Sequence, residues 1–285
     1  MSCACRRGAV LLALLPMAGC ATMIRQGKSP LLPAQMSPDS VVLDIFLVRF
    51  PFGDPDANEK LWEEIDEQPF SPRLRQRWSR NGFRVGLVTG QMPIDLSKIM
   101  ELSDKPPANG KLEQTAVKNL DAKPRVLRRH LQLRAGQRGL VQTSGVYQQL
   151  PLVLSDQGGL CGGTYSLAQG MFAIKAFPQP DGQVRLEVTP ELYHDQPQQR
   201  FVANQGVMRL EVGRPKLVFD DLALAANLSP GGLLVLSSLP NRPGSLGHYF
   251  FTEKGDRQEQ KLLVIRLSQT QNDPLFEPSP TLKTE

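Results

Sequence analysis

Cysteine, histidine and aromatic residues are scarce in this chain. It has four cysteines, three histidines and two tryptophans in 285 residues. Cys3 and Cys5 lie in an N-terminal leader, so Cys20 and Cys161 are the cysteines left after it. If Cys20 is modified, no disulfide can form within the chain, and stability must come from an ordinary hydrophobic core. The leader's apolar run, Ala9–Leu15, is far shorter than the ~20 residues of a membrane-spanning helix.

Several catalytic and binding motifs are also missing. The chain has no Gly-x-x-x-x-Gly-Lys-Ser/Thr phosphate loop, no Gly-x-Ser-x-Gly nucleophile turn and no Asp-x-Asp-x-Asp-Gly calcium loop. The histidines are dispersed, and His194-Asp195, the only close pair of a histidine and a carboxylate, is expected in a loop after Tyr193. We therefore expect no metal, no cofactor and no enzymatic activity.

The N-terminus is the most informative stretch. Arg6 and Arg7 precede the apolar run, and the small residues Ala18 and Gly19 lead into Cys20. A charged region, a short apolar region and small residues before a cleavage point are the layout of a secretory signal. Residues 1–19 are therefore predicted to be a signal peptide.

The segment Met17-Ala-Gly-Cys20 resembles the lipobox of bacterial lipoproteins, with Met17 where leucine is usual. The resemblance implies that Cys20 becomes the N-terminus and carries lipid. The alternative is a plain signal peptide cut before or near Cys20. Ala21 stands where many inner-membrane lipoproteins have aspartate, so the resemblance implies a lipid-anchored, periplasm-facing protein of the outer membrane.

The charge balance is mild. Removal of Arg6 and Arg7 lowers the formal net charge from +5 to +3, which gives no reason to expect a nucleic-acid partner. Two charge clusters are expected to be solvated. The basic one, expected on a surface or linker, comprises Arg125, Arg128, Arg129 and His130; the acidic one comprises Asp54, Asp56, Glu63, Glu64, Asp66 and Glu67.

Composition and periodicity predict an α+β chain: a small β-α-α-β-α unit followed by a mainly antiparallel β domain. The predicted segments are a signal peptide (1–19), a lipidated cysteine and flexible tether (20–40), the α/β unit (41–102), a polar linker (103–124), the β-rich domain (125–270) and a disordered, proline-rich tail (271–285).

Two stretches of the α/β unit have clear signatures. The nearly continuous apolar run Val41–Phe50 predicts a strand buried on both faces or central to a sheet. A helix is predicted from Ser71 as cap to the stop Asn81-Gly82. A further helix is predicted around 58–68, and Trp62 and Trp78 are expected to be core anchors.

In the second half, Gln179-Pro-Asp-Gly182 predicts a hairpin turn between two strands. After it, Val184, Leu186 and Val188 alternate with polar residues, so one face of that strand is expected in the core. The order of four short pieces in this half resembles the C-terminal β-domain of secretins, outer-membrane ring proteins of secretion systems. The pieces are Leu186-Glu-Val-Thr-Pro190, Gly231-Gly-Leu233, Pro243–Gly247 with Phe250-Phe251, and Lys261–Ile265.

The secretin resemblance implies a ring-building or assembly role. The short segments between the pieces leave little room for membrane-inserting hairpins, so pore formation is not expected. Cys161, in Gly158-Gly-Leu-Cys-Gly-Gly163, has the residue type of a nucleophile but no recognisable histidine partner. A mobile hairpin loop is the simpler interpretation, with glycines supplying positive φ.

The favoured hypothesis is a lipid-anchored, non-enzymatic scaffold or assembly component of the cell envelope, for which the resemblance implies a reduced secretin-like protein. Its expected partners are the membrane, through Cys20, and an envelope protein or a second copy of the chain. The alternative is a periplasm-facing lipoprotein that binds a solute or polysaccharide. The tyrosines Tyr165, Tyr193 and Tyr249, with Phe250, are the candidate stacking residues for such a ligand.

Overall fold

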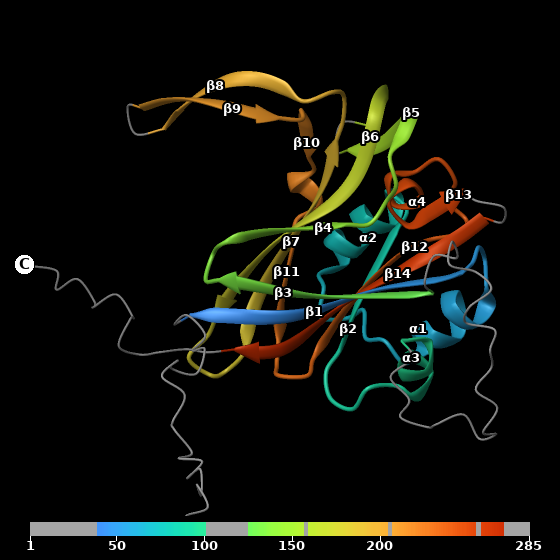
Figure 1. The fold of residues 1–285 in the computed structure, drawn as a ribbon. Helices are drawn as coiled ribbons and strands as arrows, with labels where there is room; N and C mark the ends of the chain where they lie inside the picture. The colour runs from blue at the N-terminus through green and yellow to red at the C-terminus, as the bar shows by residue number, and fades with distance from the viewer. Residues whose placement is uncertain (1–38, 101–124, 157–158, 205–206, 255–257, 271–285) are drawn as a thin grey trace, which may run out of the picture. The chain divides into compact units, whose positions relative to one another are not determined.

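The computed structural model describes residues 39–100, 125–156, 159–204, 207–254 and 258–270, which all belong to one compact unit, 36–285. The first sheet is entirely antiparallel (Figure 1). Its order is β2 (Phe83–Val88), β12 (Leu233–Ser238), β14 (Gln258–Thr270), β1 (Ser40–Pro51) and β3 (Val126–Arg134), and β13 (Thr252–Lys254) also pairs with β14.

The second sheet is also antiparallel. It runs β10 (Lys216–Val218), β7 (Val184–Tyr193), β6 (Gly159–Pro178) and β4 (Arg138–Gln142), with β11 (Leu224–Leu228) on β7 and β5 (Tyr147–Asp156) on β6. A separate hairpin pairs β8 (Gln198–Asn204) with β9 (Val207–Gly213). The long β6 therefore pairs with three strands: its first half forms a hairpin with β5, and its second half lies between β7 and β4.

Both faces of β1 are buried, as its sequence predicts, because each face packs against its own apolar cluster, while β14 and β3 flank the strand within the sheet. Leu43, Ile45 and Leu47 belong to the core cluster that contains residues of both sheets. Phe46 and Val48 belong to a second cluster on the other face of the first sheet. A strand between two apolar environments has no solvated face, which explains its nearly continuous apolar run.

The helical segments are short. They are η1 (Asp56–Lys60), α1 (Leu61–Glu63), α2 (Pro72–Arg80), α3 (Ile94–Ile99), η3 (Asp220–Leu222) and α4 (Leu246–Phe251). The predicted cap of α2 is confirmed: Ser71 Oγ accepts a 3.3 Å hydrogen bond from the Leu74 N–H, and Gly82 after the helix has φ +77°. The helix predicted around 58–68 ends at Glu63, so Ile65 lies beyond it. Trp62 and Trp78 are both buried, as expected.

The predicted β-rich character is confirmed, and so is the hairpin between β6 and β7, where Gly182 has φ +79°. The separate β-α-α-β-α unit is not confirmed. Its two strands, β1 and β2, are not neighbours, and β14 and β12 from the C-terminal half lie between them. The predicted signal peptide, tether, linker and tail fall outside the described residues, apart from the last residues of the tether. Among the described helices, none is long and apolar enough to span a membrane.

Candidate functional site

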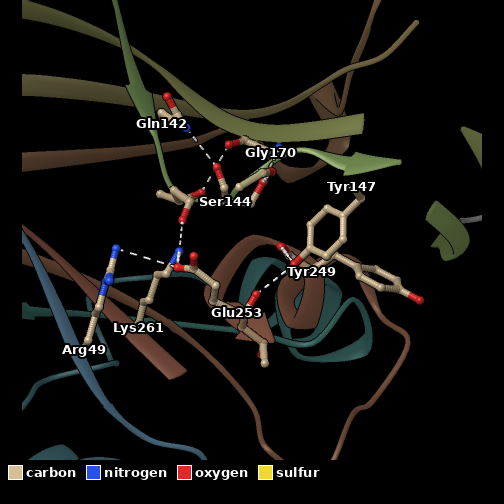
Figure 2. Close-up of polar contacts among 11 residues, drawn as sticks. Arg49, Gln142, Ser144, Tyr147, Gly170, Tyr249, Glu253 and Lys261 are labelled. Carbon is tan, nitrogen blue, oxygen red and sulfur yellow. Dashed lines mark hydrogen bonds and ion pairs between the residues drawn. The ribbon is translucent and has the colours of Figure 1, made fainter. Parts of the chain in front are cut away.

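A buried ion pair lies where the two sheets meet. Lys261 on β14 is 3% exposed, and its Nζ lies 2.9 Å from Glu253 Oε2 on β13. The same ammonium donates a 2.9 Å hydrogen bond to the Thr143 carbonyl, which follows β4. Arg49 on β1 lies 3.7 Å from the same carboxylate oxygen (Figure 2). A buried charge is tolerated only when it is paired and hydrogen-bonded, and Lys261 meets both conditions.

The turn between β4 and β5 is fastened to β6 beside this ion pair. Ser144 Oγ accepts a 2.7 Å hydrogen bond from the Gly170 N–H on β6. In return, the Gly170 carbonyl accepts hydrogen bonds from the N–H and the hydroxyl of Thr143. Gln142 donates from its side chain to the Ser144 carbonyl (Figure 2). Lys261 therefore contacts a turn whose own geometry is held by four further hydrogen bonds.

Tyr147 on β5 ties this turn to α4. Its hydroxyl lies 2.9 Å from the Tyr249 carbonyl and 2.7 Å from the Thr252 carbonyl, which are backbone acceptors at the end of α4 (Figure 2). Burial raises the pKa of Tyr147 well above its ordinary value, and the nearby charge of Glu253 and the Tyr249 side chain add to the effect. The phenol is thus held in its protonated, donating form.

These polar groups join segments that are distant in sequence. Lys261 is paired with a carboxylate. The hydroxyls of Ser144 and Tyr147 are hydrogen-bonded to the backbone. The cluster connects β1, β13, β14, the β4–β5 turn, β6 and α4, which is a stabilising function.

The second candidate is a groove beside the β5–β6 hairpin, with a volume of about 370 Å³. One wall carries Leu154 and Cys161, which face each other across the hairpin. The opposite side carries Arg77 on α2, whose guanidinium lies 3.6 Å from Asp221 Oδ1 on η3. The other lining residues are Asn81, Ser155, Val218, Phe219, Asp220 and Leu222.

The two faces of the β5–β6 hairpin differ. Directly paired residues of antiparallel strands project to the same face, and successive residues alternate. The pairs Leu154–Cys161 and Ser155–Leu160 are therefore on opposite faces. Val153 shares the face of Leu160, and both are large, apolar and exposed, at 51% and 78%. This apolar hairpin face points away from the one that carries Cys161.

Most of the candidate site residues named in the sequence analysis do not come together in the structure. Cys20 falls outside the described residues. The prediction of a loop around Cys161 is wrong, since Gly159–Gly163 belong to β6 and pair with β5. Within this described stretch only Gly159 has a positive φ. Strand pairing with β5 continues to the pair Asp156–Gly159, which leaves the glycines in extended backbone.

The histidines and carboxylates that could serve as metal ligands also lie apart from one another. His194 and Asp195 follow β7, as expected, and their side chains are in contact at 2.9 Å. Asp220 and Asp221 begin the short helix η3. Within the described ranges, no three His, Cys, Asp or Glu side chains are grouped to hold a metal. The groove residues described here also include no histidine next to Cys161.

The basic cluster is exposed on the surface, which is one of the two expected positions, and it lies at the first sheet and not on a linker. Arg128, Arg129 and His130 belong to β3, an edge strand of the first sheet, and Arg125 immediately precedes it. Asp44 on the neighbouring strand β1 is buried and contacts two members of the cluster: His130 Nδ1 at 2.5 Å and Arg128 Nη2 at 3.3 Å.

The Lys261–Glu253 pair is what the sequence analysis missed. Lys261 begins an apolar segment, Leu262–Ile265, and is expected there only as the polar start of a strand. Its hydrogen-bond acceptor, Thr143, is 118 positions away. No local pattern connects two such residues. The one available signal is a charged residue directly beside a wholly apolar run.

Comparison with known proteins returned no match: no family model, curated protein or solved structure resembles this chain.

Proposed function

We propose that this protein is a lipid-anchored, non-enzymatic scaffold of the bacterial cell envelope, which assembles by self-association. The anchor is Cys20, in the segment that resembles a lipobox. The proposed location is the outer membrane, with the folded part facing the periplasm. The resemblance to secretins supports an assembly role without carrying it alone.

The observation that carries the proposal is the apolar hairpin face. Val153 and Leu160 share one face of β5–β6 and are more than half exposed. Their burial against a second copy is favourable by roughly 1.5–3 kcal/mol for each fully buried side chain. The two strands are paired over nine residue pairs, so the hairpin presents these side chains on a defined backbone. Such a surface suits contact between folded subunits.

The test is the molar mass of the chain from residue 21, by light scattering over a concentration series. A discrete oligomer is expected, and Val153→Ser combined with Leu160→Ser should weaken association at least about tenfold. Ile94→Ser is the matched control, because Ile94 is 71% exposed but lies on α3, outside the hairpin. A strict monomer, or equal loss in the control, would contradict self-association through this face.

The anchor is tested separately. Cys20→Ala in the full chain should move the protein from the membrane fraction to the soluble fraction after cell lysis. Unchanged membrane attachment would contradict lipidation at Cys20.

The second candidate function is binding of a solute or polysaccharide, and the groove beside Cys161 favours it. This groove offers a guanidinium and two carboxylates beside apolar side chains, a mixture that suits a polar organic ligand. The matching test is a thermal-shift screen with oligosaccharides. A stabilisation that Arg77→Gln abolishes would favour binding over assembly, with the melting temperature of unliganded Arg77→Gln as its baseline.

A further inference from the structure

The edge strand β3 concentrates positive charge. Residues 125–134 contain four arginines, one histidine and no acidic residue. In the first sheet this strand has β1 as its neighbour on one side, and it is the end strand of the sheet order (Figure 1). Long arginine side chains on both faces of an end strand can reach the same external surface. We call Arg125, Arg128, Arg129, His130 and Arg134 the basic edge.

This charge is only partly neutralised. Asp44 lies within ion-pair distance of Arg128 and His130. Among the described residues, no ion pair involves Arg125, Arg129 or Arg134, and all three are exposed. Three exposed guanidinium groups that form no ion pair with the described residues are available to an external anion.

Apolar surface lies directly beside these arginines. A groove of about 160 Å³ separates β3 from β4, and Arg129 lies on its wall with Leu127, Leu131 and Leu140. Leu140 is 42% exposed. Guanidinium groups next to an open aliphatic groove suit a surface with phosphate outside and hydrocarbon beneath it, which describes a phospholipid membrane. Aliphatic side chains are of less use to a nucleic acid, whose bases stack on aromatic rings.

Strand β1 enters the first sheet beside the basic edge. Ser40, the first residue of β1, pairs with Arg134 at the end of β3. The chain that leads back to Cys20 therefore enters the first sheet next to Arg134.

We propose that the basic edge docks on an anionic phospholipid surface, with arginines on lipid phosphates and Leu140 against the acyl region. The inference rests on the proposed attachment of the chain to a membrane. Each basic residue near an anionic surface strengthens binding by about fivefold. A lipid anchor with a second, electrostatic contact would hold the sheet in one orientation.

The test uses the chain from residue 20 with Cys20→Ser, so that no lipid contributes. The probes are vesicles of phosphatidylglycerol and phosphatidylcholine, and vesicles of phosphatidylcholine alone, in co-sedimentation. Binding to the anionic vesicles only is expected, and it should weaken as salt rises. Arg129→Gln with Arg134→Gln should reduce affinity about 25-fold. Leu140→Ser should reduce it further if the side chain enters the acyl region.

Arg73→Gln with Arg80→Gln is the matched control. Both arginines are exposed on α2, so this variant has the same net charge as the test variant and should bind as the parent chain does. Equal loss in both variants would overturn the inference, because it would show an effect of net charge. Absence of binding at low salt would also overturn it, as would tighter binding to a DNA duplex than to the vesicles. None of these results bears on membrane release by Cys20→Ala. The proposal of a lipid anchor and the proposal of a docking edge can therefore be contradicted independently.

Discussion

Gly247 on α4 lies directly against the carbonyl of Gly82, at the turn between α2 and β2. A Cβ at position 247 would be 2.1 Å from the Gly82 oxygen and 2.8 Å from the Phe83 nitrogen. The Gly247 N–H also donates a 2.8 Å hydrogen bond to the Asn81 carbonyl. The two backbones meet at a distance that only glycine permits, so α4 and the α2–β2 turn are locked together.

Gly247→Ala should therefore destabilise the fold strongly. The clash is with backbone atoms on both sides, which cannot move without breaking the Asn81 hydrogen bond, and we expect a loss of about 3 kcal/mol or more. Gly145→Ala is the control, because nothing lies within 4 Å of its Cβ position. Urea unfolding followed by circular dichroism gives both values. A loss under 1 kcal/mol for Gly247→Ala would contradict the close contact.

Lys261→Met should cost about 3 kcal/mol of unfolding free energy, because it leaves Glu253 and the Thr143 carbonyl without the ammonium. Adding Glu253→Gln should restore part of the loss, since the carboxylate that keeps only its longer contact with Arg49 is then neutral. The control, Lys60→Met, breaks an exposed pair with Asp95 and should cost less than about 1 kcal/mol. Equal costs in urea unfolding for the two lysine variants would contradict a coupled, buried pair.

Tyr147 should make stability depend on alkaline pH. Burial raises its pKa in the folded chain above the ordinary value of 10.0. Its contribution is thus complete below pH 10 and is lost as pH rises further, because the unfolded chain ionises first. The slope from this one group is about 1.4 kcal/mol per pH unit.

Tyr147→Phe should remove that slope, and it should cost about 1–2 kcal/mol at neutral pH because two backbone carbonyls lose their donor. Unfolding free energies at neutral pH test the predicted cost, and those above pH 10 test the predicted loss of the slope. The same alkaline slope in the variant and the parent would show that Tyr147 ionises normally.

Neither half of the chain should fold alone. β1 requires β14 and β3 as neighbours, and β2 requires β12, so a cut at residue 124 separates paired strands. Fragments 36–124 and 125–285 should each lack dispersed amide signals in NMR spectra, and mixing them should restore at least part of the dispersion. A well-folded fragment 36–124 would instead support the independent α/β unit that the sequence predicts.

Local features were predictable from the sequence. The cap at Ser71, the turn at Gly182 and the alternation of Val184, Leu186 and Val188 each depend on residues a few positions apart. Short-range geometry is encoded by which residue types tolerate a given backbone conformation. The doubly buried strand β1 was also predictable, because its apolar run is nearly continuous.

The tertiary structure alone decided which strands pair. β1 and β14 are more than 200 residues apart, yet their register is continuous apart from one bulge. A polar, proline-containing stretch before residue 125 suggested a domain boundary, but strand pairing is specified by long-range packing that composition does not record. The same limit hid the Lys261–Glu253 pair. The basic cluster is visible in the sequence, but only the strand pairing of the first sheet places it on an edge strand, just as it brings Lys261 to Glu253.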